Sequence, residues 1–226
     1  MILYSGKSKL DPDTDIVAIA TPHSDNAKTG DMIQTWIITS DQSPQEASKL
    51  GKDNAICGRC PHRRSLGGSC YVVLFQGPRA VYTKFRKGGY SKKFNTLGRA
   101  IRLGAYGDPY AIPIQVWDKL LVGARKWTGY THQWKRDDAQ EYAKICMASV
   151  DSLAEKAQAN SMGWRTFRVT SDLSTVQPDE IRCPADAGKF TNCERCGLCN
   201  GNTSKGKNIF VLVHGAVKSR FVEIDV

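Results

Sequence analysis

The sequence predicts an α/β fold, either an incomplete (β/α) barrel or an open parallel sheet, with an N-terminal antiparallel strand region and two cysteine-rich metal loops. From Ala100 onward, short apolar runs alternate with helical patterns, which is typical of parallel strands joined by crossover helices. Before this point, three β-rich runs at 2–6, 16–22 and 32–40 are separated only by turn residues. Such short connections favour antiparallel pairing of these three runs.

The 226 residues are interpreted as a single domain, because a chain of this length buries one core of ordinary size. Ser43, Pro44 and Glu46 have the spacing of a helix N-cap, first position and third position, so a short helix is expected before the first cysteines. A second helix is expected over 77–86. We divide the domain into an N-terminal β-rich region (1–50), a first cysteine cluster with a basic segment (51–99), a β/α core (100–182) and a cysteine-rich loop with terminal strands (183–226).

Five polar or ionisable residues stand at or just past the predicted carboxyl ends of strands in the β/α core and behind it. Parallel strands present their carboxyl ends on one side of a sheet, and ligand sites of α/β folds lie there. Taken singly, an Asp after a strand commonly caps a helix, and a lone His is commonly structural. Taken together, they predict one catalytic cleft lined by Asp108, His132, Asp151, Arg168 and His214. A terminal strand is expected behind this site, over 220–226.

The second cysteine cluster is the strongest local signal in the chain. Cys183, Cys193, Cys196 and Cys199 follow the pattern C-x9-C-x2-C-x2-C among glycines and small polar residues. Three sulfurs in so short a loop fit poorly around one tetrahedral zinc ion, whereas an iron–sulfur cubane binds each sulfur at a different iron. The pattern therefore favours a [4Fe–4S] cluster over structural zinc, with free thiols as the remaining alternative.

The first cysteine cluster has three members, Cys57, Cys60 and Cys70, in the pattern C-x2-C-x9-C. Three cysteines can hold a second [4Fe–4S] cluster with one iron left for substrate or cofactor. With His62 as a fourth ligand, the same residues form a Cys3His zinc site instead. Cys146 lies in an apolar run and is expected to be a buried, inert thiol.

The composition indicates a basic, cytoplasmic protein. No apolar run approaches the roughly eighteen residues of a membrane span, and Met1 is not followed by a secretory signal. The formal net charge is +10 at pH 7, which favours attraction to a polyanion such as DNA or RNA, although basic surfaces also occur for solubility alone. The cationic residues expected to contact phosphate are Lys92, Lys93, Arg99, Arg125, Lys126, Lys205 and Lys207.

Several of these motifs together resemble a group of uncharacterised phage-encoded cysteine-rich proteins over nearly the whole chain. The motifs are CGRCP at 57–61, GSCYV at 68–72, GDP at 107–109 and YTH at 130–132. The first cysteine cluster and the strand ends behind it are also similar to the mycobacteriophage "gene product 88" family. This resemblance implies a phage or prophage origin and a barrel-like α/β core, and it implies no particular activity. The layout resembles the radical S-adenosylmethionine enzymes too, but the chain lacks their C-x3-C-x2-C loop and a Gly-Gly-Glu motif.

Two functions follow as expectations. The first is an iron–sulfur protein with one or two [4Fe–4S] clusters, acting as an enzyme in redox or radical chemistry on a nucleotide or nucleic acid. The alternative is a zinc-stapled nucleic-acid-binding protein without catalysis. No P-loop, dinucleotide fingerprint or Gly-x-Ser-x-Gly elbow is present, which argues against ATP hydrolysis, dinucleotide binding and serine hydrolase chemistry.

Overall fold

The computed structural model describes residues 1–189, 191–203 and 206–222 and confirms an α/β fold with open sheets. The N-terminal sheet is mixed: β1, β2 and β3 pair antiparallel, and β4 and β5 then add in parallel. The predicted antiparallel region and the change to parallel strands are therefore both right. In spatial order its strands are β1 (Ile2–Lys7), β2 (Asp15–Thr21), β3 (Ile33–Thr39), β4 (Ala100–Tyr106) and β5 (Lys126–Thr128).

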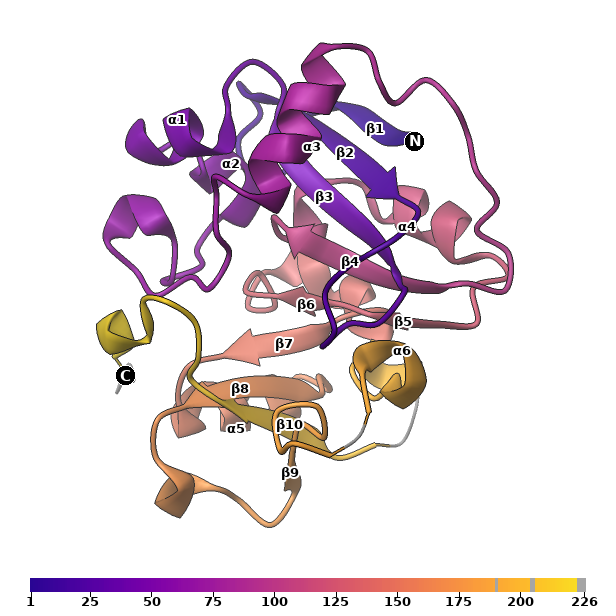
Figure 1. The fold of residues 1–226 in the computed structure, drawn as a ribbon. Coiled ribbons are helices and arrows are strands. Elements are labelled where there is room, and N and C mark those ends of the chain that lie inside the picture. Colours follow the sequence, from indigo (N-terminus) through magenta and orange to yellow (C-terminus); the bar gives the residue numbers. More distant parts are fainter. Residues whose placement is uncertain (190, 204–205, 223–226) are drawn as a thin grey trace.

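The second sheet is entirely parallel. The last strand of the described chain, β10, inserts between β8 and β9 instead of extending the edge. In spatial order the strands are β6 (Tyr130–Thr131), β7 (Met147–Val150), β8 (Thr166–Thr170), β10 (Asn208–Leu212) and β9 (Glu180–Arg182). Figure 1 shows this sheet continuing below the first without closing into a barrel.

A single glycine joins the two sheets. Gly129 lies between β5 and β6; its N–H donates to the Cys199 carbonyl at 3.0 Å, and its carbonyl accepts from the Met147 N–H at 2.9 Å. A Cβ atom on Gly129 would lie 2.9 Å from both Cys146 Sγ and the Ile145 carbonyl oxygen. The close approach of these backbones therefore requires a residue without a side chain.

Short helices cover the strands. The helix expected after Ser43 is present, with both hydrogen bonds of a capping box between Ser43 and Glu46. The helix expected over 77–86 is present too, and contacts β3, as Figure 1 shows. The α-helices are α1 (Pro44–Lys49), α2 (Asn54–Cys57), α3 (Gly77–Arg86), α4 (Ile114–Leu121), α5 (Leu153–Ser161) and α6 (Cys193–Cys196). The 3₁₀ segments are Arg64–Leu66, Pro109–Ala111, Asp137–Lys144, Leu173–Thr175, Gly201–Thr203 and Lys218–Arg220.

Two local expectations differ from the structure. One of the helices expected after Ala100 is a 3₁₀ helix, Asp137–Lys144, which contains Ala139 and Tyr142. Both residues are buried and stand three positions apart, and a 3₁₀ helix aligns such pairs on one side. The terminal strand expected over 220–226 is not found within the described part, where Lys218–Arg220 form a 3₁₀ turn. Residues 223–226 lie outside the described residues, as does Lys205.

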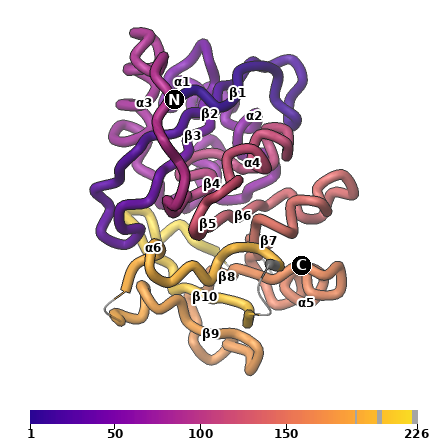
Figure 2. The backbone as a smooth tube through the Cα atoms, turned by 90° about the vertical axis from the view of Figure 1, so that its right-hand side faces the viewer, coloured from indigo at the N-terminus to yellow at the C-terminus, as the bar shows by residue number. Residues whose placement is uncertain are grey.

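One large apolar core holds both parts together. Its largest members are the fully buried Trp117, Trp134 and Trp164, which come from the second half of the chain, and they pack in one cluster with Ile16 and Ile37 of the N-terminal sheet. Figure 2 shows the N-terminal half above the C-terminal half, with β4 to β7 running between them. Among the described residues, no helix is long and apolar enough to cross a membrane.

Candidate functional site

A cavity of about 470 Å³ brings the two cysteine clusters together. Residues of β4 to β8 and of β10, and residues just after these strands, line it, so it extends over both sheets. Cys57, Cys60 and Cys70 of the first cluster line it, together with Cys183 and Cys193 of the second. Segments more than a hundred positions apart in the sequence thus share one cavity.

Backbone and side-chain hydrogen bonds dock the first cluster on the carboxyl ends of β4 and β6. Asp108, just after β4, donates its N–H to the Ile56 carbonyl at 2.6 Å. Gln133, just after β6, donates from Nε2 to the Cys57 carbonyl at 3.2 Å. Within the loop, the buried Asp53 accepts from Arg63 at 3.0 Å and from the Ser65 hydroxyl at 2.6 Å. The loop that carries the thiols is therefore held at the end of the sheets where α/β proteins bind ligands.

The second cluster is docked by contacts to three separate segments. Cys183 directly follows β9 and donates its N–H to the Phe210 carbonyl at 2.8 Å. Cys193, the first residue of α6, donates to the Lys28 carbonyl at 2.9 Å in the loop between β2 and β3. The carbonyl of Cys199 accepts from Gly129 at the junction of the sheets.

Burial and neighbouring thiols set the pKa values of the cysteines. Burial raises the pKa of Cys57 well above its ordinary value, and the neighbouring thiols of Cys60 and Cys70 raise it further. Burial likewise raises the pKa of Cys199 to about 12, with the other three thiols of its cluster acting in the same direction. Without a cation these thiols are protonated, and a bound metal would reverse this preference because it needs thiolates.

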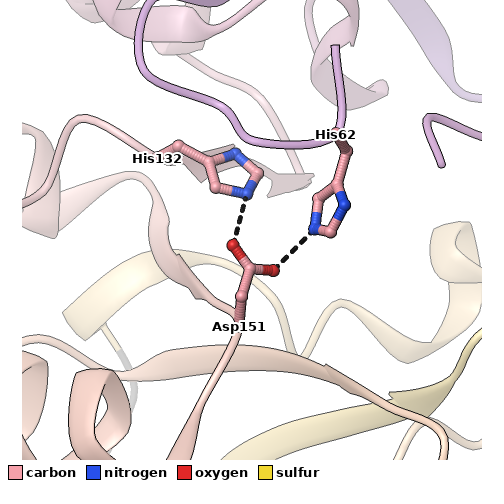
Figure 3. A group of neighbouring side chains, drawn as sticks. All are labelled: His62, His132 and Asp151. Carbon is pink, nitrogen blue, oxygen red and sulfur yellow. Dashed lines mark hydrogen bonds and ion pairs between the residues drawn. The ribbon is translucent and has the colours of Figure 1, made fainter. Parts of the chain in front are cut away.

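Next to the first cluster, two imidazoles meet one carboxylate (Figure 3). His62 Nε2 lies 2.7 Å from Asp151 Oδ1, and His132 Nε2 lies 3.5 Å from Asp151 Oδ2. His132 Nε2 also lies 3.9 Å from the Cys60 sulfur. Burial alone would raise the pKa of Asp151, but the hydrogen bonds of His132 and His62 outweigh it and hold this pKa well below its usual range. Burial would lower the pKa of His132, yet Cys60 and Asp151 hold it well above the ordinary value.

Asp108 and His214 also line the cavity. Asp108 Oδ2 accepts from the His132 N–H at 2.9 Å and from Gln133 Nε2 at 3.3 Å, so this carboxylate positions the strand end that carries His132. Burial raises the pKa of Asp108, although the hydrogen bonds that it accepts act against this. His214 follows β10, where its ring lies 5.6 Å from the ring of Tyr71.

The structure places Arg168 elsewhere. It lies in the middle of β8, not at its carboxyl end, and its buried guanidinium donates to both oxygens of Glu180 at 2.8 Å. It is not among the residues that line the cavity. The structure thus brings Asp108, His132 and His214 to the cavity and Asp151 to its edge through His132, while Arg168 is part of an internal ion pair.

Arg102 is a cation of the cavity that was not among the site residues predicted from the sequence. It lies in β4, lines the cavity and donates to the Tyr71 hydroxyl. It is a charged residue in the otherwise apolar run AIRLGAY, and this irregularity is the signal in the sequence that could have identified it. Thr128 lines the cavity as well, where its buried hydroxyl has no hydrogen-bond partner within the described part of the chain. A ligand with polar groups would satisfy both side chains.

Four of the seven basic residues expected to bind phosphate make local contacts, and one of the four, Lys207, donates to the Pro178 carbonyl at 3.4 Å. Arg99 pairs with Asp31 at 3.4 Å, and Arg125 pairs with Glu194 at 3.0 Å. Lys126 donates to the Arg195 carbonyl beside α6. Lys92 and Lys93 are exposed.

The spacing of donor atoms bears on which metal each group fits. Among the described residues, His62, His132 and Asp151 form the one group of at least three potential ligands whose donor atoms all lie within 4.8 Å of one another. A tetrahedral zinc with Zn–S bonds of about 2.3 Å holds its sulfurs ~3.8 Å apart. No three thiols of the described chain lie within 4.8 Å of one another, so neither cysteine cluster has the spacing of an assembled tetrahedral zinc site. Both ring nitrogens of His62 are engaged, with Asp151 and with Ser69 Oγ at 2.9 Å, so it would have to leave one of them to complete a Cys3His zinc site.

Comparison of the chain with protein-family models, with curated proteins and with solved structures finds no match.

Proposed function

We propose that this protein is an iron–sulfur enzyme that binds an anionic substrate in the cavity between its two cysteine clusters. The observation that carries the proposal is that five cysteines from two distant segments line one cavity together with Arg102, His132 and His214. A purely structural metal site needs no cavity beside it. A structural zinc ion usually has four protein ligands and no open coordination position. Cysteines from two distant segments line this cavity together with a guanidinium and imidazoles, and this combination favours catalysis.

The side chains of the cavity have distinct tasks in this proposal. Arg102 binds the anionic group of the substrate, and Lys28 at the rim adds a second positive charge. The Thr128 hydroxyl hydrogen-bonds a polar group of the same ligand. His214 lines the same cavity and is placed to exchange a proton with the substrate. A phosphate-bearing substrate such as a nucleotide or a nucleic-acid end has the matching charge.

The clusters would be held by two different ligand sets. Cys183, Cys193, Cys196 and Cys199 provide four thiolates for a [4Fe–4S] cluster, and Cys57, Cys60 and Cys70 provide three. When bound, such clusters supply electron transfer, and a cluster with three cysteine ligands keeps one iron accessible to substrate or cofactor. The docking of both loops by backbone hydrogen bonds keeps the thiols beside the cavity.

The decisive experiment is anaerobic purification followed by analysis of iron, acid-labile sulfide and zinc. We expect a brown protein with iron and sulfide in equal amounts. Cys196→Ser should lower the iron content and the melting temperature together, because the loop 183–199 has too little apolar surface to order without its metal. Cys146→Ala is the matched control, since Cys146 is buried in the core and belongs to neither cluster.

A colourless protein with stoichiometric zinc would overturn the iron–sulfur proposal. It would favour the alternative, a zinc-stapled nucleic-acid-binding protein, for which the net charge of +10 is the supporting observation. Iron content unchanged in Cys196→Ser would show that the second cluster does not bind iron.

A further inference from the structure

The cluster of His62, His132 and Asp151 has a geometry of its own that involves no cysteine ligand. The three residues come from separate segments: His62 from the loop after α2, His132 from the end of β6 and Asp151 from the end of β7. Figure 3 shows both imidazoles pointing at the carboxylate, each toward a different oxygen. Asp151 is buried, while the two imidazoles are partly exposed. The group is therefore internal on one side and accessible on the other.

The distances within this group match those between the ligands of one metal ion. Bonds of about 2.0–2.2 Å from a divalent metal to imidazole nitrogen and carboxylate oxygen place neighbouring donors ~3.0–3.4 Å apart, depending on the coordination geometry. The two nitrogen-to-oxygen distances are 2.7 and 3.5 Å. All three donor atoms lie within 4.8 Å of one another. The two nitrogen-to-oxygen distances need shifts of only a few tenths of an ångström to accommodate an ion between the donors.

We propose that His62, His132 and Asp151 bind one divalent first-row transition metal ion, such as Fe²⁺ or Mn²⁺, at the edge of the cavity. Two imidazoles and one carboxylate are a ligand set that suits these metals, and three protein ligands leave coordination positions open. His62 and His132 line the main cavity, and His132 and Asp151 line a second hollow of about 260 Å³ beside it. The open positions thus face space that a substrate or water can enter.

Neighbouring groups orient the three ligands. The Ser69 hydroxyl lies 2.9 Å from His62 Nδ1, which fixes the ring with Nε2 toward Asp151. The ring of Phe221 stacks on His62 at 5.6 Å. The Asp108 carboxylate holds the backbone N–H of His132 at 2.9 Å. Partners of this kind are a regular feature of metal sites, because they set the direction in which the ligand atom points.

This inference does not rest on the iron–sulfur proposal, because none of the three ligands is a cysteine. The probe is therefore Mn²⁺, which prefers oxygen and nitrogen ligands and is poorly held by thiolates. The protein of residues 1–226 is stripped with a chelator, and free Mn²⁺ is followed by electron paramagnetic resonance during a titration. We expect one Mn²⁺ bound per chain. Asp151→Asn and His132→Gln should each weaken binding at least tenfold.

The controls separate the site from other sources of Mn²⁺ binding. His23→Gln should leave the affinity unchanged; His23 forms an exposed pair with Asp31 at 3.0 Å and so repeats the histidine–carboxylate chemistry away from the cavity. Cys146→Ala should also leave it unchanged, because this buried thiol belongs to neither cysteine cluster. Ser69→Ala, which keeps all three ligands, should weaken binding about tenfold through loss of ring orientation.

Two results would overturn the inference. The first is a wild-type protein that binds no Mn²⁺, and this measurement needs no variant to fold. The second is an affinity equal to that of wild type in a folded Asp151→Asn or His132→Gln protein, as judged by near-ultraviolet circular dichroism. In either case the three residues form a hydrogen-bonded group only.

Discussion

Two buried aspartates at the carboxyl ends of strands differ in charge preference because their partners differ. Asp108 accepts hydrogen bonds from neutral donors, the N–H groups of Tyr110 and His132 and the amide of Gln133, and burial raises its pKa. Asp151 faces two imidazoles instead, and its pKa is held well below the usual range. Asp108 therefore fixes the backbone through hydrogen bonds to its N–H groups. Asp151 keeps the negative charge that binding of a cation requires.

At the residue scale, the stability of the fold depends on the buried ion pair of Arg168 and Glu180. Glu180→Gln leaves the buried guanidinium without a charged partner, which should lower the free energy of unfolding by about 3–5 kcal/mol. Urea denaturation measures this. Asp118→Asn is the matched control, because Asp118 pairs with Lys144 at the exposed surface and should cost less than about 1 kcal/mol. Equal losses in the two variants would contradict the assignment of Arg168 to an internal pair.

At the scale of elements, the junction between β5 and β6 determines how the two sheets meet. A prediction follows for Gly129→Ala: the new methyl group would collide with Cys146 Sγ and the Ile145 carbonyl, both at 2.9 Å. Relief requires the backbones to move apart, so we expect a loss of about 1–3 kcal/mol in unfolding free energy. Thermal and urea unfolding measure the loss.

The same junction connects to the second cysteine cluster, because the Gly129 N–H donates to the Cys199 carbonyl. Gly129→Ala should therefore also lower metal retention by the second cluster, and Ala124→Gly, a change of the same size before β5, should not. A Gly129→Ala variant with wild-type stability and metal content would contradict both predictions. It would show that the backbones can move apart here without loss of unfolding free energy.

At the scale of the whole molecule, Arg102 lines the cavity, whereas Arg99 and Arg125 of the basic segments pair with carboxylates. Arg102→Gln should therefore weaken binding of a nucleoside triphosphate at least tenfold, with a smaller dependence on salt, because one charge-assisted contact is lost. Isothermal calorimetry at two salt concentrations measures both. Lys119→Gln, an exposed cation of α4 that does not line the cavity, is the control.

The opposite pattern would support a different partner. Binding of single-stranded DNA or RNA that is unaffected by Arg102→Gln but falls steeply with salt would locate the nucleic acid on the outer surface. The exposed Lys92 and Lys93 would then be the residues to change next.

Much of the fold could be predicted because it depends on local patterns. The alternation after Ala100 and the turn-separated runs before it determined the α/β class and the antiparallel beginning. The capping box at Ser43 and the helix over 77–86 depend only on neighbours within a few positions, and both are confirmed. The positions of Asp108, His132, Asp151 and His214 just after strands also followed from these patterns.

What the tertiary structure decided was which of these residues meet. The order of strands in the second sheet, with β10 inserted beside β8, is not encoded in any local pattern, and it brings His214 to the cavity. Arg168 and Arg102 are both cations in apolar strands, and only packing pairs the first with Glu180 and leaves the second in the cavity. The sequence by itself thus determined the elements and the candidate ligands, because these depend on periodicity and residue chemistry. Their convergence depends on contacts between residues many positions apart, which only the folded chain specifies.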